Sequence, residues 1–120
     1  MIAANCKEKD VRYLDEALLE ELRDILEEEF PALVSTYVQD SAVRVKDMQD
    51  AFVRGDMEAL RKSAHSLKGA SANLGLELLT DLCRELEESV MAGALDGMEA
   101  RLGQVGEEQL RAAGLLKAFL

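Results

Sequence analysis

The sequence predicts an all-α protein: an antiparallel four-helix bundle with an additional short N-terminal helix. The 120 residues include a single proline and are rich in Leu, Glu, Ala and Arg, which favour helices. Apolar residues recur every three to four positions, and few segments alternate with the period of two that is typical of strands. Aromatic residues make up only 4% of the chain, so the core must consist mostly of Leu, Val, Ala and Met.

A chain of this length predicts one domain. Residues 1–13 show no clear periodicity and are expected to form a loose lead-in, so the helical domain is expected to span residues 14–120. The initial Met1 and the complete set of helices favour a free-standing protein over a piece of a larger kinase, although an excised domain would look the same.

Pro31 is expected in the first turn of the second helix, because the missing N–H of proline costs nothing there. Asp15 is placed to cap the first helix, which should end near Glu28, and Gly55 should end the second. The apolar side of the first helix is expected to carry Leu18, Leu19, Leu22, Ile25 and Leu26. That of the second is expected to carry Phe30, Val34, Tyr37, Val38, Ser41, Val45, Met48 and Phe52.

The third helix is expected from Asp56, a capping residue, to about Leu74, where Gly75 can adopt the left-handed conformation that closes a helix. Its buried stripe would consist of Met57, Leu60, Ala64, Leu67, Ser71 and Leu74. His65, the only histidine of the chain, would point roughly 140° away from the centre of that stripe. It should therefore face water.

The fourth helix is expected from about Leu76 to Ala92, with Gly93 as its stop. Its inward residues would be Leu78, Leu79, Leu82, Cys83, Leu86 and Val90. Asp96 and Glu99 predict a capping box for the fifth helix. The inward residues of that helix would be Met98, Leu102, Val105, Leu110, Ala113 and Leu116. Three glycines inside it (Gly103, Gly106 and Gly114) predict that it is the weakest helix.

The net charge of −10 argues against binding to nucleic acid or to an anionic membrane surface. The sign reverses locally around His65, because residues 54–72 include four basic and two acidic side chains. The N-terminus lacks the apolar run of a signal peptide, and no run is long enough to cross a bilayer. Cys6 and Cys83 do not form a disulfide framework, so the cytoplasm is the expected location.

The surroundings of His65 suggest a phosphoryl acceptor, although an exposed histidine without a function would also satisfy its position. Basic side chains flank it on the helix surface: Arg61, Lys62 and Lys68. Gly69 and Ala72, one to two turns on, leave little bulk over the ring and would let a second protein approach. A neutral imidazole has a free nitrogen lone pair for attack on phosphorus.

The segment His65-Ser66-Leu67-Lys68-Gly69, followed by small residues and a closing Leu74-Gly75, resembles the histidine-containing phosphotransfer (HPt) domain family. Leu82-Cys83-Arg84-Glu85-Leu86-Glu87 resembles the next helix of that family, and the resemblance covers roughly residues 14 to 118. It also implies a four-helix bundle.

The resemblance implies that His65 receives a phosphoryl group from an aspartate of a receiver domain and passes it to another receiver domain. Lys68 would stabilise the phosphoryl oxygens, and Gly69 would leave room for the partner. Many HPt domains carry a Gln where this chain has Glu87. A carboxylate there would hold the ring N–H, or Glu87 would be one more surface acid, like Glu85 and Glu88.

The implied partners are response-regulator receiver domains and a hybrid sensor kinase, with the protein itself a monomer. The receiver would supply Mg²⁺, so the protein would need no cofactor and no metal site of its own. It would be a stoichiometric carrier and not an enzyme.

Other functions lack their motifs. The sequence lacks the Gly-rich phosphate loop that would predict ATP binding. One histidine is too few for a di-metal site, and two cysteines are too few for a zinc site. Two alternatives stay open. In the first, the protein is a helical adaptor that binds receiver domains without carrying phosphate. In the second, it is a phosphatase-like modulator that removes phosphate from a receiver domain.

Overall fold

The computed structural model describes residues 13–120, so nearly all of the predicted lead-in at residues 1–13 lies outside the described residues. No strand occurs in this described range, which confirms the all-α prediction. The elements are α2 (Glu16–Leu26), the one-turn 3₁₀ helix η1 (Glu27–Glu29), α3 (Phe30–Arg54), α4 (Met57–Asn73), α5 (Glu77–Met91) and α6 (Met98–Lys117).

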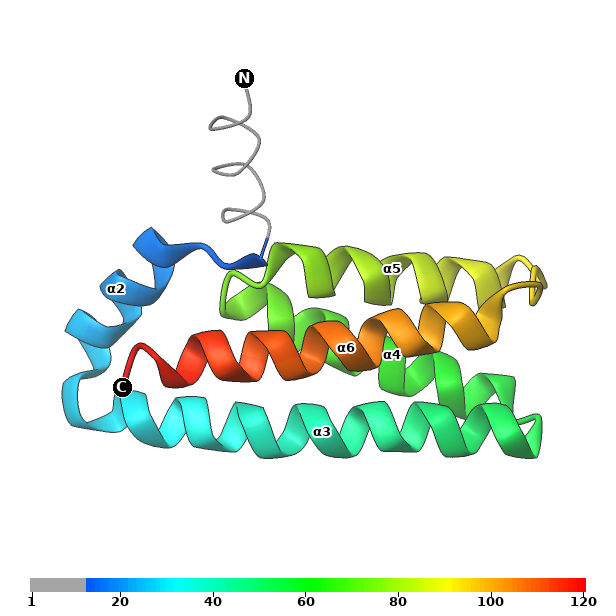
Figure 1. Ribbon diagram of the computed structural model, residues 1–120, viewed down its shortest axis with the longest axis horizontal. Coiled ribbons are helices and arrows are strands. Elements are labelled where there is room, and N and C mark those ends of the chain that lie inside the picture. Colours follow the sequence, from blue (N-terminus) through cyan, green and yellow to red (C-terminus); the bar gives the residue numbers. More distant parts are fainter. Residues whose placement is uncertain (1–12) are drawn as a thin grey trace, which may run out of the picture.

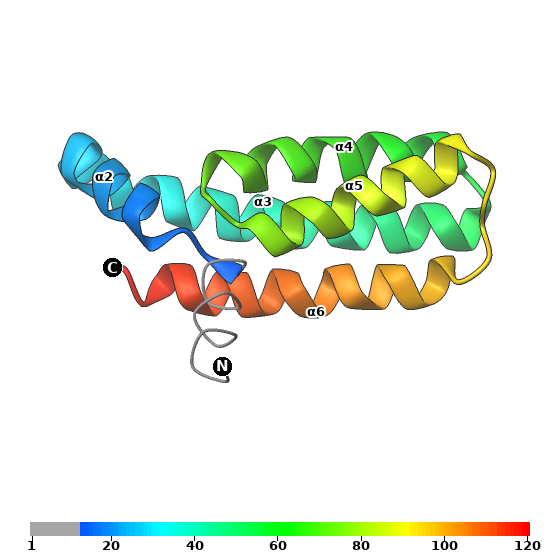
Figure 2. The same cartoon turned by 90° about the horizontal axis from the view of Figure 1, so that it is seen from above.

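Helices α3 to α6 form an antiparallel four-helix bundle, in which each helix runs opposite to the one before it in the chain (Figure 1). Helix α4 packs against α3 and α5, and α6 packs against the same two helices, so α4 and α6 lie diagonally opposite each other. The shorter α2 crosses one end of the bundle, as predicted (Figures 1 and 2). There the Arg23 guanidinium donates to the Phe119 carbonyl at 3.3 Å and lies over the Phe119 ring.

One apolar stripe from each bundle helix forms the core. The larger side chains that are fully buried include Phe30, Met48, Leu60, Leu67, Leu79, Leu86, Met98 and Leu116. Two polar pairs interrupt this apolar interior: Tyr37 and Ser71 share a hydrogen bond of 2.7 Å, and the Gln109 amide donates to Ser41 Oγ at 3.0 Å. Each buried polar group in these pairs therefore has the partner that burial requires.

The predicted inward positions of Leu110 and Ile25 are wrong. The Leu110 side chain is 71% exposed and Ile25 is 68% exposed. Each lies roughly 120° around its helix from the residues that face the core, which is beyond the reach of a single buried stripe. Gln109 occupies the buried position next to Leu110 because Ser41 satisfies its amide.

The predicted capping box of α6 is also wrong. The N-cap is Gly97, which has a φ of 75°, and neither Asp96 nor Glu99 makes a side-chain cap hydrogen bond. The left-handed glycine turns the chain directly into the first turn of α6, so this turn begins without a side-chain acceptor. The helix nevertheless continues through Gly103, Gly106 and Gly114 to Lys117.

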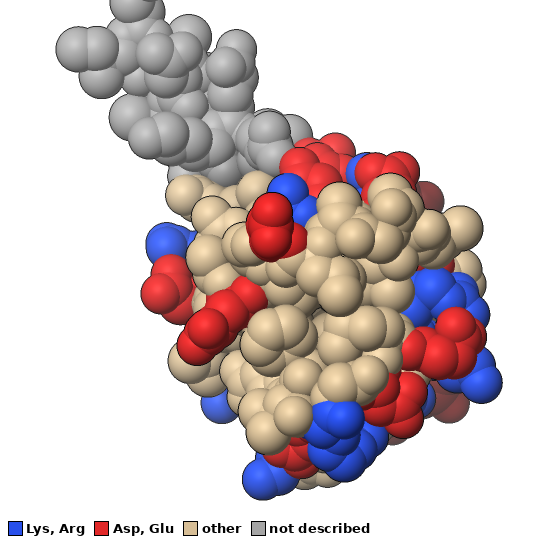
Figure 3. Space-filling view, turned by 90° about the vertical axis from the view of Figure 1, so that its right-hand side faces the viewer, with Lys and Arg blue, Asp and Glu red and all other residues tan. Residues whose placement is uncertain are grey.

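The end of the bundle opposite α2 carries few charges at its centre. In Figure 3 uncharged side chains form the middle of this end, with Lys, Arg, Asp and Glu mostly around it. Three exposed apolar residues belong to it: Val53 near the end of α3, Met91 at the end of α5, and Leu95 in the following loop. No described helix is both long and apolar enough to cross a membrane.

The turn between α4 and α5 is bound to the start of α2. Gly75 has a φ of 72°, as predicted, and its carbonyl accepts a hydrogen bond of 2.9 Å from the Asp15 N–H. Asp15 also caps α2, because its Oδ1 accepts from the Leu18 N–H at 3.1 Å. A Cβ on Gly75 would lie 2.7 Å from Asp15 Cβ, so only glycine fits this contact.

We expect Gly75→Ala to lower the free energy of unfolding by about 2 kcal/mol or more, because it adds a clash to the cost of a left-handed alanine. The matched control is Gly93→Ala, which has a φ of 71° but nothing within 4 Å of the added Cβ. The control should cost only about 1 kcal/mol. Urea unfolding followed by circular dichroism measures both, and equal losses would contradict the proposed close contact.

Candidate functional site

His65 lies on the solvent-facing side of α4. The opposite side of this helix buries Leu60, Ala64 and Leu67, which sets the rotation of the helix about its axis. Asp56 caps its first turn by accepting from the Ala59 N–H at 3.0 Å. The His65 side chain is consequently 63% exposed, as the apolar period predicts.

A carboxylate from the neighbouring helix holds the inner edge of the imidazole. Glu87 on α5 is only 9% exposed, and its Oε2 lies 2.8 Å from His65 Nδ1. Its other oxygen, Oε1, accepts a hydrogen bond of 2.7 Å from Lys68 Nζ. The Lys68 hydrogen bond lowers the pKa of Glu87 most, the His65 contact adds to this, and burial opposes both.

The lowered pKa keeps Glu87 ionised at neutral pH, so both of its oxygens only accept hydrogen bonds. Nδ1 of His65 must then be the nitrogen that carries the ring proton. In the neutral ring this leaves the lone pair on Nε2, the outer nitrogen. The contact thus selects the tautomer whose nucleophilic atom faces solvent.

The predicted group of cations around His65 is present, but carboxylates partly neutralise it. Arg61 pairs with Glu58, and its Nη1 lies 3.8 Å from Glu87 Oε2. The Arg61 hydrogen bond is also the main reason for the lowered pKa of Glu58, with a smaller contribution from the charge of Lys62. Lys62 is exposed on the same helix. Two of the three cations around His65, Arg61 and Lys68, are therefore paired with carboxylates.

Gly69 and Ala72 lie close to His65 in the sequence of α4. Both are exposed, and a Cβ on Gly69 would meet nothing within 4 Å. Packing within the described part of the chain therefore does not require a glycine at position 69. The unfavourable glycine in the middle of α4 is left without a structural explanation in its own fold.

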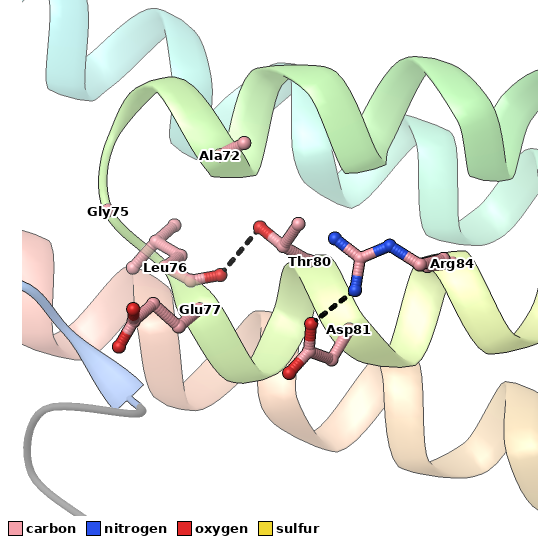
Figure 4. A pocket seen from close by; sticks show the side chains of 7 residues that line it. All are labelled: Ala72, Gly75, Leu76, Glu77, Thr80, Asp81 and Arg84. Carbon is pink, nitrogen blue, oxygen red and sulfur yellow. Dashed lines mark hydrogen bonds and ion pairs between the residues drawn. The ribbon is translucent and has the colours of Figure 1, made fainter.

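Two recesses flank α4 near its C-terminal end. One lies between α4 and α5, has a volume of about 330 Å³, and is lined by Ala72, Gly75, Leu76, Glu77, Thr80, Asp81 and Arg84 (Figure 4). Its polar groups are largely engaged: Thr80 Oγ1 donates to the Leu76 carbonyl and Arg84 pairs with Asp81. The other, of about 380 Å³, is more apolar and is lined by Leu22, Leu33, Thr36, Tyr37, Asp40, Ala70, Asn73 and Leu74.

No cluster of three or more His, Cys, Asp or Glu side chains suited to a metal ion occurs among residues 13–120. Cys83 is a free, buried thiol, and burial raises its pKa to about 12. Cys6 lies outside the described residues.

Comparison with known proteins assigns the family. A family model for the Hpt domain matches residues 32–116, which is more than half of the chain. The chain belongs to the Hpt domain family. The crystal structure of histidine-containing phosphotransfer protein B (HptB) from Pseudomonas aeruginosa PAO1 is 40% identical, with a TM-score of 0.84 over 88% of this chain and 92% of that one. A comparison with curated protein sequences found no match.

Membership of the Hpt domain family confirms the predicted histidine phosphotransfer role in a phosphorelay, and with it an interaction with receiver domains. The bundle of this Hpt domain also matches the fold that the sequence predicts. The roles of single residues rest on the geometry described above. That geometry joins Glu87 to His65 and Lys68, a contact that the sequence left open.

The sequence predicted neither of the two recesses that flank α4 in this Hpt domain, although some of their lining residues belong to the segments that resemble the family: Ala72, Leu74, Gly75 and Arg84. Thr80, Asp81 and Arg84 lie at helical spacing on α5, but Thr80 is itself buried, and acids and bases are too common on helices for this pattern to indicate a recess. Leu22, Leu33 and Leu74 come from three different elements, so only the folded arrangement brings them together.

The lowered pKa of Glu87 predicts a pH dependence of stability. A carboxyl group whose pKa is lower in the folded than in the unfolded state stabilises the fold above its ordinary pKa, and this stabilisation is lost as the pH falls through the folded value. Glu87→Gln should therefore lower the free energy of unfolding more at pH 7 than at pH 3. Urea unfolding at a series of pH values measures this, and a loss independent of pH would contradict it.

Proposed function

We propose that Nε2 of His65 is the phosphoryl acceptor of this Hpt domain. Its donor is the acyl phosphate on an aspartate of a receiver domain. The Nε2 lone pair attacks phosphorus, the P–O bond to the aspartate breaks, and the electron pair of that bond returns to the aspartate carboxylate. The proton stays on Nδ1, beside Glu87, throughout this step. The observation that carries the proposal is the exposed imidazole held through Nδ1 at 2.8 Å by a buried carboxylate.

Lys68 supplies positive charge at the reacting centre in this proposal. It lies one turn beyond His65 on α4, and the Glu87 carboxylate that contacts the ring also accepts a hydrogen bond from it. Charge on the phosphoryl oxygens attracts its ammonium group. Arg61 and Lys62 add to the local positive potential that attracts an anionic partner group, and Gly69 with Ala72 leaves the space that the active site of the receiver enters.

The same chemistry run in reverse passes the group on. The P–Nε2 bond is labile, so a second receiver domain takes the phosphoryl group on its own aspartate and His65 is regenerated. We propose a monomer that exchanges phosphate between the receiver domain of a hybrid sensor kinase and a response regulator in the cytoplasm. The receivers supply Mg²⁺ and most of the catalytic groups, so the protein acts as a stoichiometric carrier without a cofactor of its own.

His65→Gln should abolish phosphate uptake while the fold survives, because the substitution lies on an exposed face. The test mixes the purified protein with a phosphorylated receiver domain, separates the two, and measures acid-labile, base-stable phosphate on this chain. Equal amounts of phosphate on the wild type and on the variant would contradict the acceptor role of His65. No label on either, across several receivers, would favour the adaptor that carries no phosphate. Loss of phosphate from the receiver without any label here would favour the modulator.

Gly69→Gln should slow transfer from a receiver domain at least about tenfold, since a long side chain would stand in the approach to His65. Gly69→Ala adds only a methyl group in open space and should raise the free energy of unfolding by about 0.5–1 kcal/mol.

The matched control for Gly69→Gln is Gly103→Gln. Gly103 is also exposed in a helix and open around its Cβ position, but it lies on α6, diagonal to α4. This control should transfer phosphate normally. Transfer by Gly69→Gln at the control rate would show that position 69 does not border the docked partner.

A further inference from the structure

We infer that Glu87 shortens the lifetime of the phosphorylated state, because its carboxylate keeps the proton on Nδ1 of phosphorylated His65. This inference rests on the proposed function, and it concerns how readily the phosphoryl group leaves. Glu87 is then a positioning residue, since it touches the imidazole and never the phosphorus.

The position of Glu87 together with its negative charge gives it this role, and a neutral amide in the same position would lack the charge. The carboxylate is 9% exposed and lies 2.8 Å from Nδ1, on the ring edge that faces the protein. Phosphorylation of Nε2 occurs on the opposite, solvent-facing edge and leaves this contact in place. The phosphorylated ring with a proton on Nδ1 is a cation, and a buried anion beside it stabilises that charge.

The proton on Nδ1 decides what leaves when the P–N bond breaks. With this proton in place, water forms the new bond to phosphorus, the electron pair of the P–Nε2 bond goes to Nε2, and the leaving group is a neutral imidazole. If Nδ1 has lost its proton, the leaving group is an imidazolate anion, which is far more basic and leaves slowly. A group that holds the proton on Nδ1 thus keeps the phosphorylated protein in its reactive form.

The other charged groups near this contact do not provide the same effect. Lys68 and Arg61, both from α4, face Glu87 and are cationic, so they oppose a positive charge on the ring. On α5, Cys83 faces the same carboxylate, but burial raises its pKa to about 12 and it stays neutral. Glu87 is consequently the single anion that touches the imidazole among the described residues.

The experiment loads His65 chemically with phosphoramidate, so that no receiver domain is needed. The loss of acid-labile phosphate is then followed between pH 6 and pH 9 in the wild type and in Glu87→Gln, which keeps the shape and removes the charge. We expect the phosphorylated variant to live about ten times longer at pH 8, because the variant lacks the negative charge that stabilises the cationic ring in the wild type. The control is Glu88→Gln, which removes an exposed carboxylate one residue away on α5 and should leave the lifetime unchanged.

Lys68 could produce a similar result by another route, because Glu87→Gln releases its ammonium to hold the phosphoryl oxygens. The comparison is therefore repeated in a Lys68→Met background. A longer lifetime that persists there supports the inference, and an effect that vanishes there overturns it. An unchanged or shorter lifetime in the single variant overturns it as well.

The wild type alone provides a second measurement if the variant fails to fold. The loss of phosphate slows as the pH rises. This slowing should occur at a higher pH in the folded protein than in the protein unfolded in urea, because only the fold brings Glu87 to the ring. Identical pH profiles in the two states overturn the inference. Failure of the proposed function would look different from failure of this inference. In that case the wild type would accept no phosphate from any receiver domain, whatever its reaction with phosphoramidate.

Discussion

The burial of one stripe of α4 between α3 and α5 sets the direction of every α4 side chain at the site. Leu60, Ala64 and Leu67 are fully buried there, so the helix cannot rotate without exposing them. Once this stripe faces the core, His65 must face solvent. Lys68 must lie on the flank next to α5, where it meets the carboxylate of Glu87. The core thus determines the geometry of a site that lies almost wholly on the surface.

The part of the site that belongs to a single helix follows from the sequence. The helical period alone places His65 and Gly69 on the exposed side of α4, and the structure agrees. The contact of His65 with Glu87 joins residues 22 positions apart on two helices. Its formation depends on how α4 and α5 are aligned along each other, which follows from the direct packing of the two helices and from the short turn that joins them. A periodic pattern within one helix contains no information about that alignment.

The errors in the predicted fold have a similar origin. The helical period identifies α6 as a helix, but the apolar character of Leu110 predicts a core position for a residue that is exposed. The core accepts Gln109 instead, since Ser41 binds its amide. Glu108 is buried next to it: Arg111 binds its Oε1 at 3.1 Å, its Oε2 has no hydrogen-bond partner among the described residues, and burial raises its pKa. Such partners are contributed by other turns or other helices, so composition cannot reveal them. The start of α6 at Gly97 depends in the same way on the conformation of the preceding loop.

The hydrogen bond between Tyr37 and Ser71 gives the molecule a built-in optical reporter. Tyr37 is buried on α3, and Ser71 belongs to the buried side of the acceptor helix. The chain has two tyrosines and no tryptophan, so no stronger emitter obscures their signal. Tyrosine emission responds to the hydrogen bonding of the phenol, and any separation of α3 from α4 would break this bond. The intrinsic fluorescence of the unlabelled protein can therefore follow movements of the helix that bears the histidine.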